Sequence, residues 1–309
     1  MPSLAVVVPA TDTPPTLDEC IRAIERAAHP PEELIVVATP PGAGPAAARN
    51  SGVRRAVSEV VVFIDADVEV HADAFDRIRA VFHADSTLSA VFGSYDADPR
   101  RHGLISDFRN LLHHHVHQSG AGPATTFWAG LGAVRRNDFE SVGGFDESRF
   151  AKASIEDIEL GMRLSANGSR IVLDPLLQGK HLKRWSLDGM IRTDLFRRGV
   201  PWARLLLETG SSAALNLSWR NRASAAASTT LVLGLITRRP KLAGAALVLL
   251  LSLNADFYRL LLRQRGLRQA AAGVPLHVLH HNVSAVSVPL AVLTHLSATR
   301  QRRKSYRYR

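Results

Sequence analysis

Three short β-branched runs, separated by helical stretches, constrain the fold of this chain most strongly. The runs are "LAVVV" (4–8), "ELIVVA" (33–38) and "VVVFI" (60–64), and the segments 16–28 and 45–57 between them have helical character. Near-continuous apolar strands that alternate with helices are typical of a parallel sheet covered on both faces. The sequence therefore predicts an α/β fold over roughly residues 1–100.

Two carboxylates follow directly after the third of these runs. In parallel sheets, ligands bind outside the carboxyl ends of the strands, and "FIDADV" places Asp65 and Asp67 at such an end. Alternate side chains of an extended chain share a face. A hard divalent cation between the two carboxylates would neutralise them and leave positions for phosphate oxygens. The pair predicts a metal and diphosphate site, with a solvated turn as the alternative.

A second acidic motif opens a helix further along the chain. From about residue 124 the sequence contains "TTFWAGLGAVRR", "VGGFDE" and "SIEDIELGMRL", which predict a strand, a glycine-rich turn and a helix. Glu156 and Asp157 stand at the start of that helix, where carboxylates suit the helix dipole. A simple charge pair at a helix N-terminus is the alternative to a functional role.

Taken in order, these motifs resemble those of the inverting family 2 glycosyltransferases with the GT-A fold. The resemblance covers roughly residues 3–200 and rests on "VVVPA", "AAARNSG", "FIDADV", "FWAGLGAVRR", "VGGFDE", "IEDIELGMRL" and "HLKRW". It implies a Rossmann-like, mostly parallel sheet flanked by helices. It also implies transfer of a sugar from a nucleotide-sugar donor, with inversion at the anomeric carbon.

The resemblance assigns roles to individual residues. Asp65 would contact the ribose or diphosphate region of the donor, and Asp67 would hold Mg²⁺ or Mn²⁺ on the diphosphate. Asp157 would be the general base, and Glu156 would help to order the acceptor. The full set implied is Pro9, Arg49, Asn50, Asp65, Asp67 and Arg184 for the nucleotide sugar, Trp128, Gly130, Glu156 and Trp185 on the acceptor side, and Asp67, Asp65 and His181 as candidate metal ligands.

The sequence departs from the family pattern in three places. In "HLKRW", His181 takes the Gln position of the family's Gln-x-x-Arg-Trp element, which is completed by Arg184 and Trp185. After the second strand, Ala38 and Thr39 stand where the family carries an acid, and "ATDTPP" replaces the usual Asn-Glu after the first strand. Because these turns hold the base in the family, uridine, guanosine and thymidine donors all remain open.

A histidine-rich stretch, "LLHHHVHQSG", offers a second metal-site hypothesis. Its members are His113, His114, His115 and His117, of which His113 and His117 are four residues apart and would share a helix face. Carboxylates are sparse nearby, so a polar helix face beside the acceptor cleft is the favoured interpretation.

The chain changes character after about residue 200. Residues 223–237 and 242–255 are apolar and are broken by "TRRPK", and 274–298 is apolar but dotted with His. None is a clean run of the roughly 20 apolar residues that a spanning helix needs. The sequence predicts a hairpin of marginal membrane helices and then an amphipathic interfacial segment, with a buried lid on a soluble enzyme as the alternative. The expected domains are a catalytic domain (1–205), a linker or interfacial helix (206–222) and a membrane-associated region ending in a basic tail (223–309).

The distribution of charge points to a membrane as partner. The formal net charge is +10, and the ten basic residues after Asp256, the last acidic residue, account for all of it. A neutral body with a basic end beside apolar segments favours an anionic membrane surface over nucleic acid. The single Cys20 rules out an internal disulfide and favours a reducing compartment, and "MPSLAVVVPA" is typical of a first strand and not of a signal peptide.

The combined expectation is an enzyme of the cytoplasmic membrane with its catalytic domain in the cytoplasm. Its acceptor would be a lipid or lipid-linked glycan, because an anchored enzyme meets acceptors in the membrane. A non-catalytic relative that binds sugar nucleotides or glycans, and a nucleotidyltransferase, are the alternatives.

Overall fold

The structure is a computed structural model that describes residues 1–210 and 219–307, with side chains described up to residue 297. It divides into two compact units, Met1–Arg184, here called the sheet unit, and Trp185–Arg309, here called the helical unit. The division precedes the boundary expected at residue 205, because the helices within 187–209 pack with the C-terminal helix. The expected linker (206–222) lies partly outside the described residues, and so do the side chains of the basic tail (300–309).

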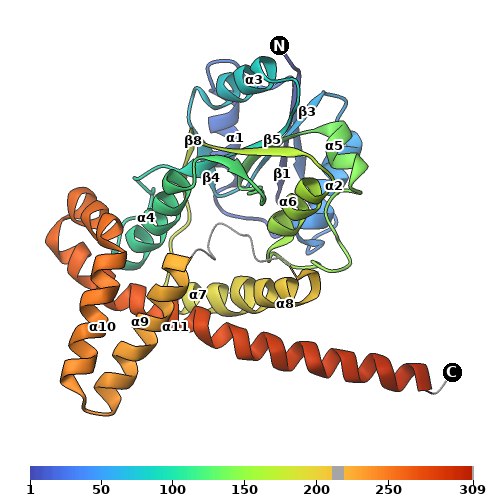
Figure 1. The fold of residues 1–309 in the computed structure, drawn as a ribbon. Coiled ribbons are helices and arrows are strands. Elements are labelled where there is room, and N and C mark those ends of the chain that lie inside the picture. Colours follow the sequence, from blue (N-terminus) through green and yellow to red (C-terminus); the bar gives the residue numbers. More distant parts are fainter. Residues whose placement is uncertain (211–218, 308–309) are drawn as a thin grey trace. The chain divides into compact units, whose positions relative to one another are not determined.

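The sheet unit is built on one eight-stranded sheet (Figure 1). Its strands are β1 (Leu4–Pro9), β2 (Glu33–Val37), β3 (Val60–Ile64), β4 (Val68–Val70), β5 (Leu88–Tyr95), β6 (Gly122–Ala124), β7 (Leu131–Arg135) and β8 (Arg170–His181). The order is β2-β1-β3-β7-β5-β8-β4, with β6 paired to β8. The three expected strands are β1, β2 and β3, and they pair in parallel. β5 and β8 are also parallel, whereas β7, β4 and β6 run antiparallel to their neighbours, so the sheet is mixed.

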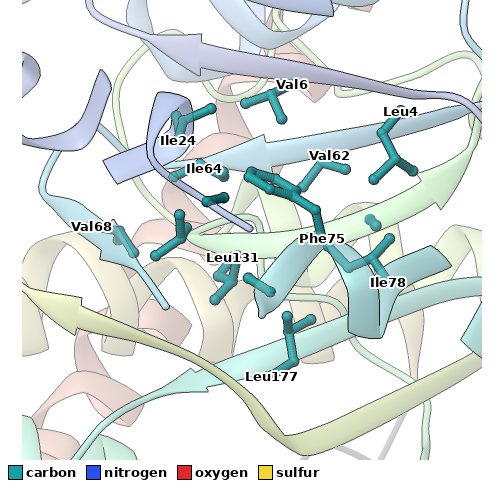
Figure 2. Packing of buried hydrophobic residues seen from close by; sticks show 14 of the residues in the cluster. Leu4, Val6, Ile24, Val62, Ile64, Val68, Phe75, Ile78, Leu131 and Leu177 are labelled. Atoms are coloured by element: carbon teal, nitrogen blue, oxygen red, sulfur yellow. The ribbon is translucent and has the colours of Figure 1, made fainter. Parts of the chain in front are cut away.

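Helices accompany the strands as the alternating sequence pattern predicts. They are α1 (Leu17–Glu25), α2 (Gly44–Arg55), α3 (Ala74–Ala84), α4 (Leu104–Ser119), α5 (Arg136–Ser141) and α6 (Glu156–Ala166). All five residues of β3 are buried. Side chains from β1, β3 and α3, among them Val6, Val62 and Phe75, pack together in the core (Figure 2). The apolar run of β3 thus fixes Asp65, the next residue, at the edge of the core.

The helical unit contains α7 (Leu187–Arg192), a π-helix η1 (Thr193–Gly199), α8 (Val200–Thr209), α9 (Trp219–Ile236), α10 (Pro240–Leu253) and α11 (Ala255–Arg307). α9 and α10 form the expected helical hairpin, in which Leu231 packs with Ala243 and Ala246. α11 is interrupted at Gly266, whose φ is +76°.

One helical segment of the described residues, Ala255–Ser297, is long and apolar enough to cross a membrane, while α10 is apolar but shorter. The expected assignment was the opposite one, with the hairpin as the spanning element. α10 is too short, with 14 residues, and α9 has 18 residues but carries Arg220 and Arg222 in its first turn.

Candidate active site

A buried arginine joins the two acidic motifs of the sheet unit. Arg49, on α2, is 4% exposed. Its guanidinium donates to Asp65 Oδ1 at 2.6 Å and to Glu156 Oε1 at 2.9 Å. Asp65 follows β3, and Glu156 opens α6, 91 residues later in the chain. The arginine therefore brings the end of a strand and the start of a helix into one charged cluster.

The charges of this cluster depend on one another. Burial lowers the pKa of the Arg49 guanidinium, but the carboxylates of Asp65, Glu156 and Asp157 outweigh it and raise that pKa, so Arg49 stays charged. Burial raises the pKa of Asp65, and repulsion from Asp67 and Glu156 adds to this, while Arg49 opposes it. Without the arginine, the same carboxylates would face one another with no cation to compensate them.

Asp157 is held by backbone groups at the start of α6. Its Oδ2 accepts from the N–H of Ala129 at 3.2 Å, and its Oδ1 accepts from the N–H of Ile158 at 2.8 Å. Burial is the main cause that raises the pKa of Asp157 to about 6, and the charge of Glu156 raises it further. A carboxylate with this pKa is ionised at neutral pH and can still accept a proton, as a general base must.

α6 approaches the backbone around Ala129 closely because Gly161 has no side chain. A Cβ at Gly161 would lie 2.2 Å from the backbone nitrogen of Phe127. Gly130 makes room for an aromatic ring in the same way, since a Cβ there would lie 2.4 Å from the indole of Trp128. The carbonyl of Gly130 also accepts from the N–H of Asp65 at 3.1 Å. The backbone of the motif "FWAG" thus binds the Asp157 carboxylate and the main chain at Asp65.

Asp67 and His181 face each other across the short β4–β8 pairing. His181 is paired with Val68 in this ladder, and the N–H of Leu182 donates to the carbonyl of Asp67 at 2.8 Å. Asp67 Oδ2 lies 3.6 Å from His181 Nε2. Burial raises the pKa of Asp67, but His181 and then Lys183 outweigh it, so the net shift is downward. Asp67 is therefore an anion at neutral pH.

These donors fit part of a divalent cation site. The described residues contain no group of three or more His, Cys, Asp or Glu side chains arranged to hold a metal ion on their own. Mg²⁺, however, is commonly bound by one or two carboxylates and completed by substrate phosphates and water. The Asp67 side chain is 27% exposed and lies 3.6 Å from the His181 ring, whereas Asp65 is hydrogen-bonded to Arg49. Asp67 is thus the better placed of the two carboxylates, with His181 beside it.

Tyr95 joins His181 to a cluster of aromatic and histidine rings. The Tyr95 ring stacks on the His181 ring with centroids 4.2 Å apart, and it also contacts His113 at 4.4 Å and Trp128 at 4.9 Å. Tyr95 was not among the expected site residues. It ends β5, so the rule that ligands bind beyond strand ends would have found it once β5 was known to run parallel to β3.

The histidine-rich stretch forms a helix face that packs on β5. His114 Nδ1 donates to the carbonyl of Tyr95 and His117 Nδ1 donates to the carbonyl of Gly93, both at 2.8 Å. These bonds and the ring contacts of His113 agree with the polar-face interpretation. Among the described residues, no metal cluster includes them.

The remaining expected residues have other surroundings. Asn50 stabilises the "VGGFDE" turn. Its Nδ2 donates to the carbonyl of Phe145 and to Glu147, and its Oδ1 accepts from the N–H of Phe145. Pro9 ends β1. Arg184 is exposed at the end of the sheet unit, and Trp185 is the first residue of the helical unit. Contact of Pro9, Asn50, Arg184 and Trp185 with a substrate stays a prediction.

The sheet and its acidic cluster define an α/β protein of the GT-A type. Residues 36–143, which include Arg49, Asp65 and Asp67, match the family model described as Glycosyl transferase family 2. This stretch of the chain is thus similar to the family 2 glycosyltransferases, as the resemblance in the sequence predicts.

Two similar proteins are named as glycosyltransferases. The chain is 26% identical to validoxylamine A glucosyltransferase of Streptomyces hygroscopicus subsp. limoneus, over 54% of this chain and 49% of that protein. It is also 26% identical to the pre-mycofactocin glycosyltransferase of Mycobacterium tuberculosis, over 54% of this chain and 36% of that protein. The chain thus spans half or less of the length of these relatives.

A solved structure shares the fold. A mannosyltransferase from Pyrobaculum calidifontis, in complex with GDP-Man and Mn²⁺, aligns with 96% of this chain and 87% of its own, with a TM-score of 0.53 and 19% identity. At that identity, the likeness concerns the fold alone.

Proposed function

We propose that this protein is a membrane-associated, metal-dependent inverting glycosyltransferase. It would move a sugar from a nucleotide-sugar donor to a membrane lipid or a lipid-linked glycan. The observation that carries this proposal is the bridge from Asp65 through Arg49 to Glu156, which sets the end of β3 beside the start of α6. One cluster then holds a donor-side carboxylate, and Asp157 beside Glu156 supplies a proton acceptor.

Asp157 acts as the general base in this proposal. The backbone bonds from Ala129 and Ile158 fix its carboxylate, and its pKa of about 6 leaves it ionised at neutral pH. It removes the proton from the acceptor hydroxyl as that oxygen attacks the anomeric carbon, and positioned proton transfer of this kind contributes about 10² to 10⁴ in rate. Glu156 is engaged by Arg49 and by the N–H of Ser154, so it orders the acceptor side and leaves the proton to Asp157.

The donor side must stabilise a departing nucleoside diphosphate. Asp67 would hold Mg²⁺ or Mn²⁺, with Asp65 and His181 beside it, and the cation would supply positive charge to the diphosphate oxygens. Arg184 would add a second positive charge. The mannosyltransferase of the same fold was solved with GDP-Man and Mn²⁺, which agrees with a nucleotide-sugar donor and a divalent cation here.

A location at the cytoplasmic membrane would explain the surface of the helical unit. The helical unit exposes large apolar side chains such as Leu235, Ile236 and Val248, and ten basic residues follow Asp256. Such a surface suits an anionic bilayer. Nucleotide sugars are made in the cytoplasm, so the sheet unit would face that compartment.

Nucleotide release from a panel of UDP-, GDP- and dTDP-sugars tests this function. The full-length protein would be assayed with membrane lipids and Mn²⁺ or Mg²⁺, and Asp157→Asn would serve as the background control. Release that needs one donor, a divalent cation and intact Asp157 supports the proposal. Tight donor binding in calorimetry, without release in any lipid extract, would mean a non-catalytic binding protein.

A further inference from the structure

The tip of the α9–α10 hairpin combines exposed apolar side chains with positive charge. Leu235 and Ile236 are 64% and 71% exposed at the end of α9, and Leu242 is 42% exposed at the start of α10. The exposed side chains of Arg238, Arg239 and Lys241, here called the tip cations, lie between and beside them. Among the described residues, the tip cations have no ion-pair partner, and the sequence contains no Asp or Glu between Glu208 and Asp256.

The hairpin is too short to cross a bilayer. α10 has 14 residues, which at 1.5 Å per residue is about 21 Å, against a hydrocarbon core of about 30 Å. α9 has 18 residues, but its first turn carries Arg220 and Arg222. A transmembrane hairpin would therefore draw cations from its base or its tip into the hydrocarbon.

α11 does not suit a span either, despite its length and composition. Its His280 pairs with the buried Asp194 of η1 at 2.8 Å, and its His295 lies 3.8 Å from Glu208 of α8. Between these two pairs, a Cβ at Gly199 would lie 2.7 Å from Cβ of Ser287, so η1 and α11 are in close contact.

The polar partners of α11 belong to a charged helical segment. The stretch Thr193–Thr209 carries Arg197, Arg198 and Arg204 as well as the two acids. A spanning α11 would take these charges into the bilayer core, where each charged side chain costs several kcal/mol. The stretch of α11 that suits a span by composition therefore lies outside the hydrocarbon core.

We propose that the helical unit is a monotopic anchor, in which the hairpin tip docks into the headgroup layer of an anionic membrane and none of its described helices crosses the bilayer. Leu235, Ile236 and Leu242 reach the boundary between the headgroups and the acyl chains, and the tip cations bind the lipid phosphates. This docking mode rests on the proposed function for its purpose, since it would hold the enzyme at a lipid acceptor. Vesicle binding and topology are measured without sugar transfer, so each proposal can fail alone.

Cysteine labelling tests the topology in the full-length chain. Cys20 is the only cysteine and is fully buried. Burial is the main cause that raises the pKa of its thiol to about 12, and the charges of Asp67 and Asp65 add to it, so Cys20 does not react with the maleimide. Thr237→Cys reports on the tip, and Ser86→Cys reports on an exposed loop of the sheet unit. A membrane-impermeant maleimide is added to sealed inside-out vesicles and, separately, to sealed right-side-out vesicles from expressing cells, before and after detergent.

A monotopic anchor predicts that Ser86→Cys is labelled in inside-out vesicles and that Thr237→Cys, docked in the headgroup layer, is not labelled in right-side-out vesicles before detergent. If both cysteines are labelled in right-side-out vesicles, the tip and the sheet unit still share a side, and only the cytoplasmic orientation fails. Labelling of Ser86→Cys in inside-out vesicles together with labelling of Thr237→Cys in right-side-out vesicles would mean that the hairpin crosses the bilayer, and would overturn the inference.

Vesicle flotation tests the role of the tip cations. Changing all three to Gln should weaken binding to vesicles with 30 mol% phosphatidylserine about 100-fold, as three surface charges of about 1 kcal/mol each imply, and should have little effect on pure phosphatidylcholine. The control removes three exposed arginines of the sheet unit, Arg22, Arg26 and Arg55, by the same substitution. An equal loss in the control would show a net-charge effect and would refute tip docking.

The apolar side chains of the tip have a separate test, since they could bind a second copy of the chain in place of the membrane. Leu235→Ser with Ile236→Ser should lower binding to both kinds of vesicle and leave the oligomeric state unchanged. The control is Val57→Ser with Leu176→Ser, at exposed sites of the sheet unit. Unchanged vesicle binding together with dissociation of an oligomer in light scattering would assign the tip to a protein interface.

Discussion

Removing the guanidinium of Arg49 should destabilise the sheet unit far more than removing an exposed arginine from the same helix. Arg49→Met keeps an unbranched side chain of similar length but leaves Asp65 and Glu156 without their shared cation. The side chains of Arg49 and Glu156 are only 5% and 6% exposed. Breaking a buried ion pair from one side costs about 3–5 kcal/mol, because an uncompensated charge is left behind. For a unit of this size, 1 kcal/mol shifts the melting temperature by about 2–4 °C, so a fall of about 6–20 °C is expected.

Arg54→Met is the matched control for this experiment. Arg54 lies on α2 as well, but its side chain is 66% exposed and its nearest acid, Glu147, is 3.7 Å away. An exposed pair of this kind contributes about 0–1 kcal/mol. Both variants would be melted as full-length protein in calorimetry, with the sheet-unit transition compared at pH 7.5. Equal shifts for the two variants would refute the view that Arg49 holds the acidic motifs together.

A double variant distinguishes the cost of leaving the carboxylates without a cation from the cost of losing the packing of the Arg49 side chain. Adding Glu156→Gln to Arg49→Met removes one of the two stranded carboxylates, so part of the lost stability should return. The deficit of Arg49→Met should also shrink at low pH, since burial raises the pKa of Asp65 and the guanidinium that opposes this is gone, so Asp65 takes up a proton more readily. A deficit that is independent of pH would point to lost packing instead.

Four further outcomes test the acidic groups and their support. Asp157→Asn should keep donor affinity and lower turnover by about 10² to 10⁴. The folded-state pKa of Asp157, about 6, lies above the ordinary value of 3.8, so ionisation of Asp157 destabilises the fold as pH rises through that interval. The same variant should therefore raise stability at pH 7.5 but not at pH 4. The kcat/KM of the wild type should fall below about pH 6, and Glu156→Gln should move that midpoint to lower pH, since the charge of Glu156 helps to raise the pKa of Asp157. Asp67→Ala should abolish Mn²⁺-dependent donor binding in calorimetry without lowering the melting temperature, and unchanged binding would remove Asp67 from the metal site. Gly161→Ala should lower both stability and turnover, because its Cβ would overlap the backbone at Phe127; an unaffected melting temperature would show that α6 can shift freely.

The local chemistry of the chain was enough to predict the first three strands and the position of Asp65 and Asp67. An apolar run as continuous as "VVVFI" has to be buried on both faces, and the first polar residues after it have to emerge at the edge of the sheet. The start of α6 at Glu156 was predicted for a similar reason, because an acidic first turn suits the helix dipole. The antiparallel insertion of β7 between β3 and β5 could not be predicted in this way, since pairing partners depend on packing between segments far apart in the chain.

The bridge formed by Arg49 belongs to the tertiary structure. In the sequence, Arg49 is one of three polar residues in "AAARNSG", and nothing local distinguishes its role from that of Asn50. Only the folded chain brings Arg49 to Asp65 and to Glu156 at the start of α6, while Asn50 holds the turn at Phe145. The same holds for the elevated pKa of Asp157, which needs the burial and the neighbouring charge that the fold creates.

The C-terminal region after about residue 200 shows the same division between composition and structure. Composition alone determined that this region is helical, apolar and basic, because long runs of Ala, Leu and Val without acids leave few other solutions. Whether a helix of such composition crosses a membrane depends on its length and its neighbours. The 14 residues of α10 and the contacts of His280 and His295 with acidic partners were decided by where helices end and which helices pack together. Pairing over long sequence separations is a property of the folded chain, and no local pattern of residues encodes it.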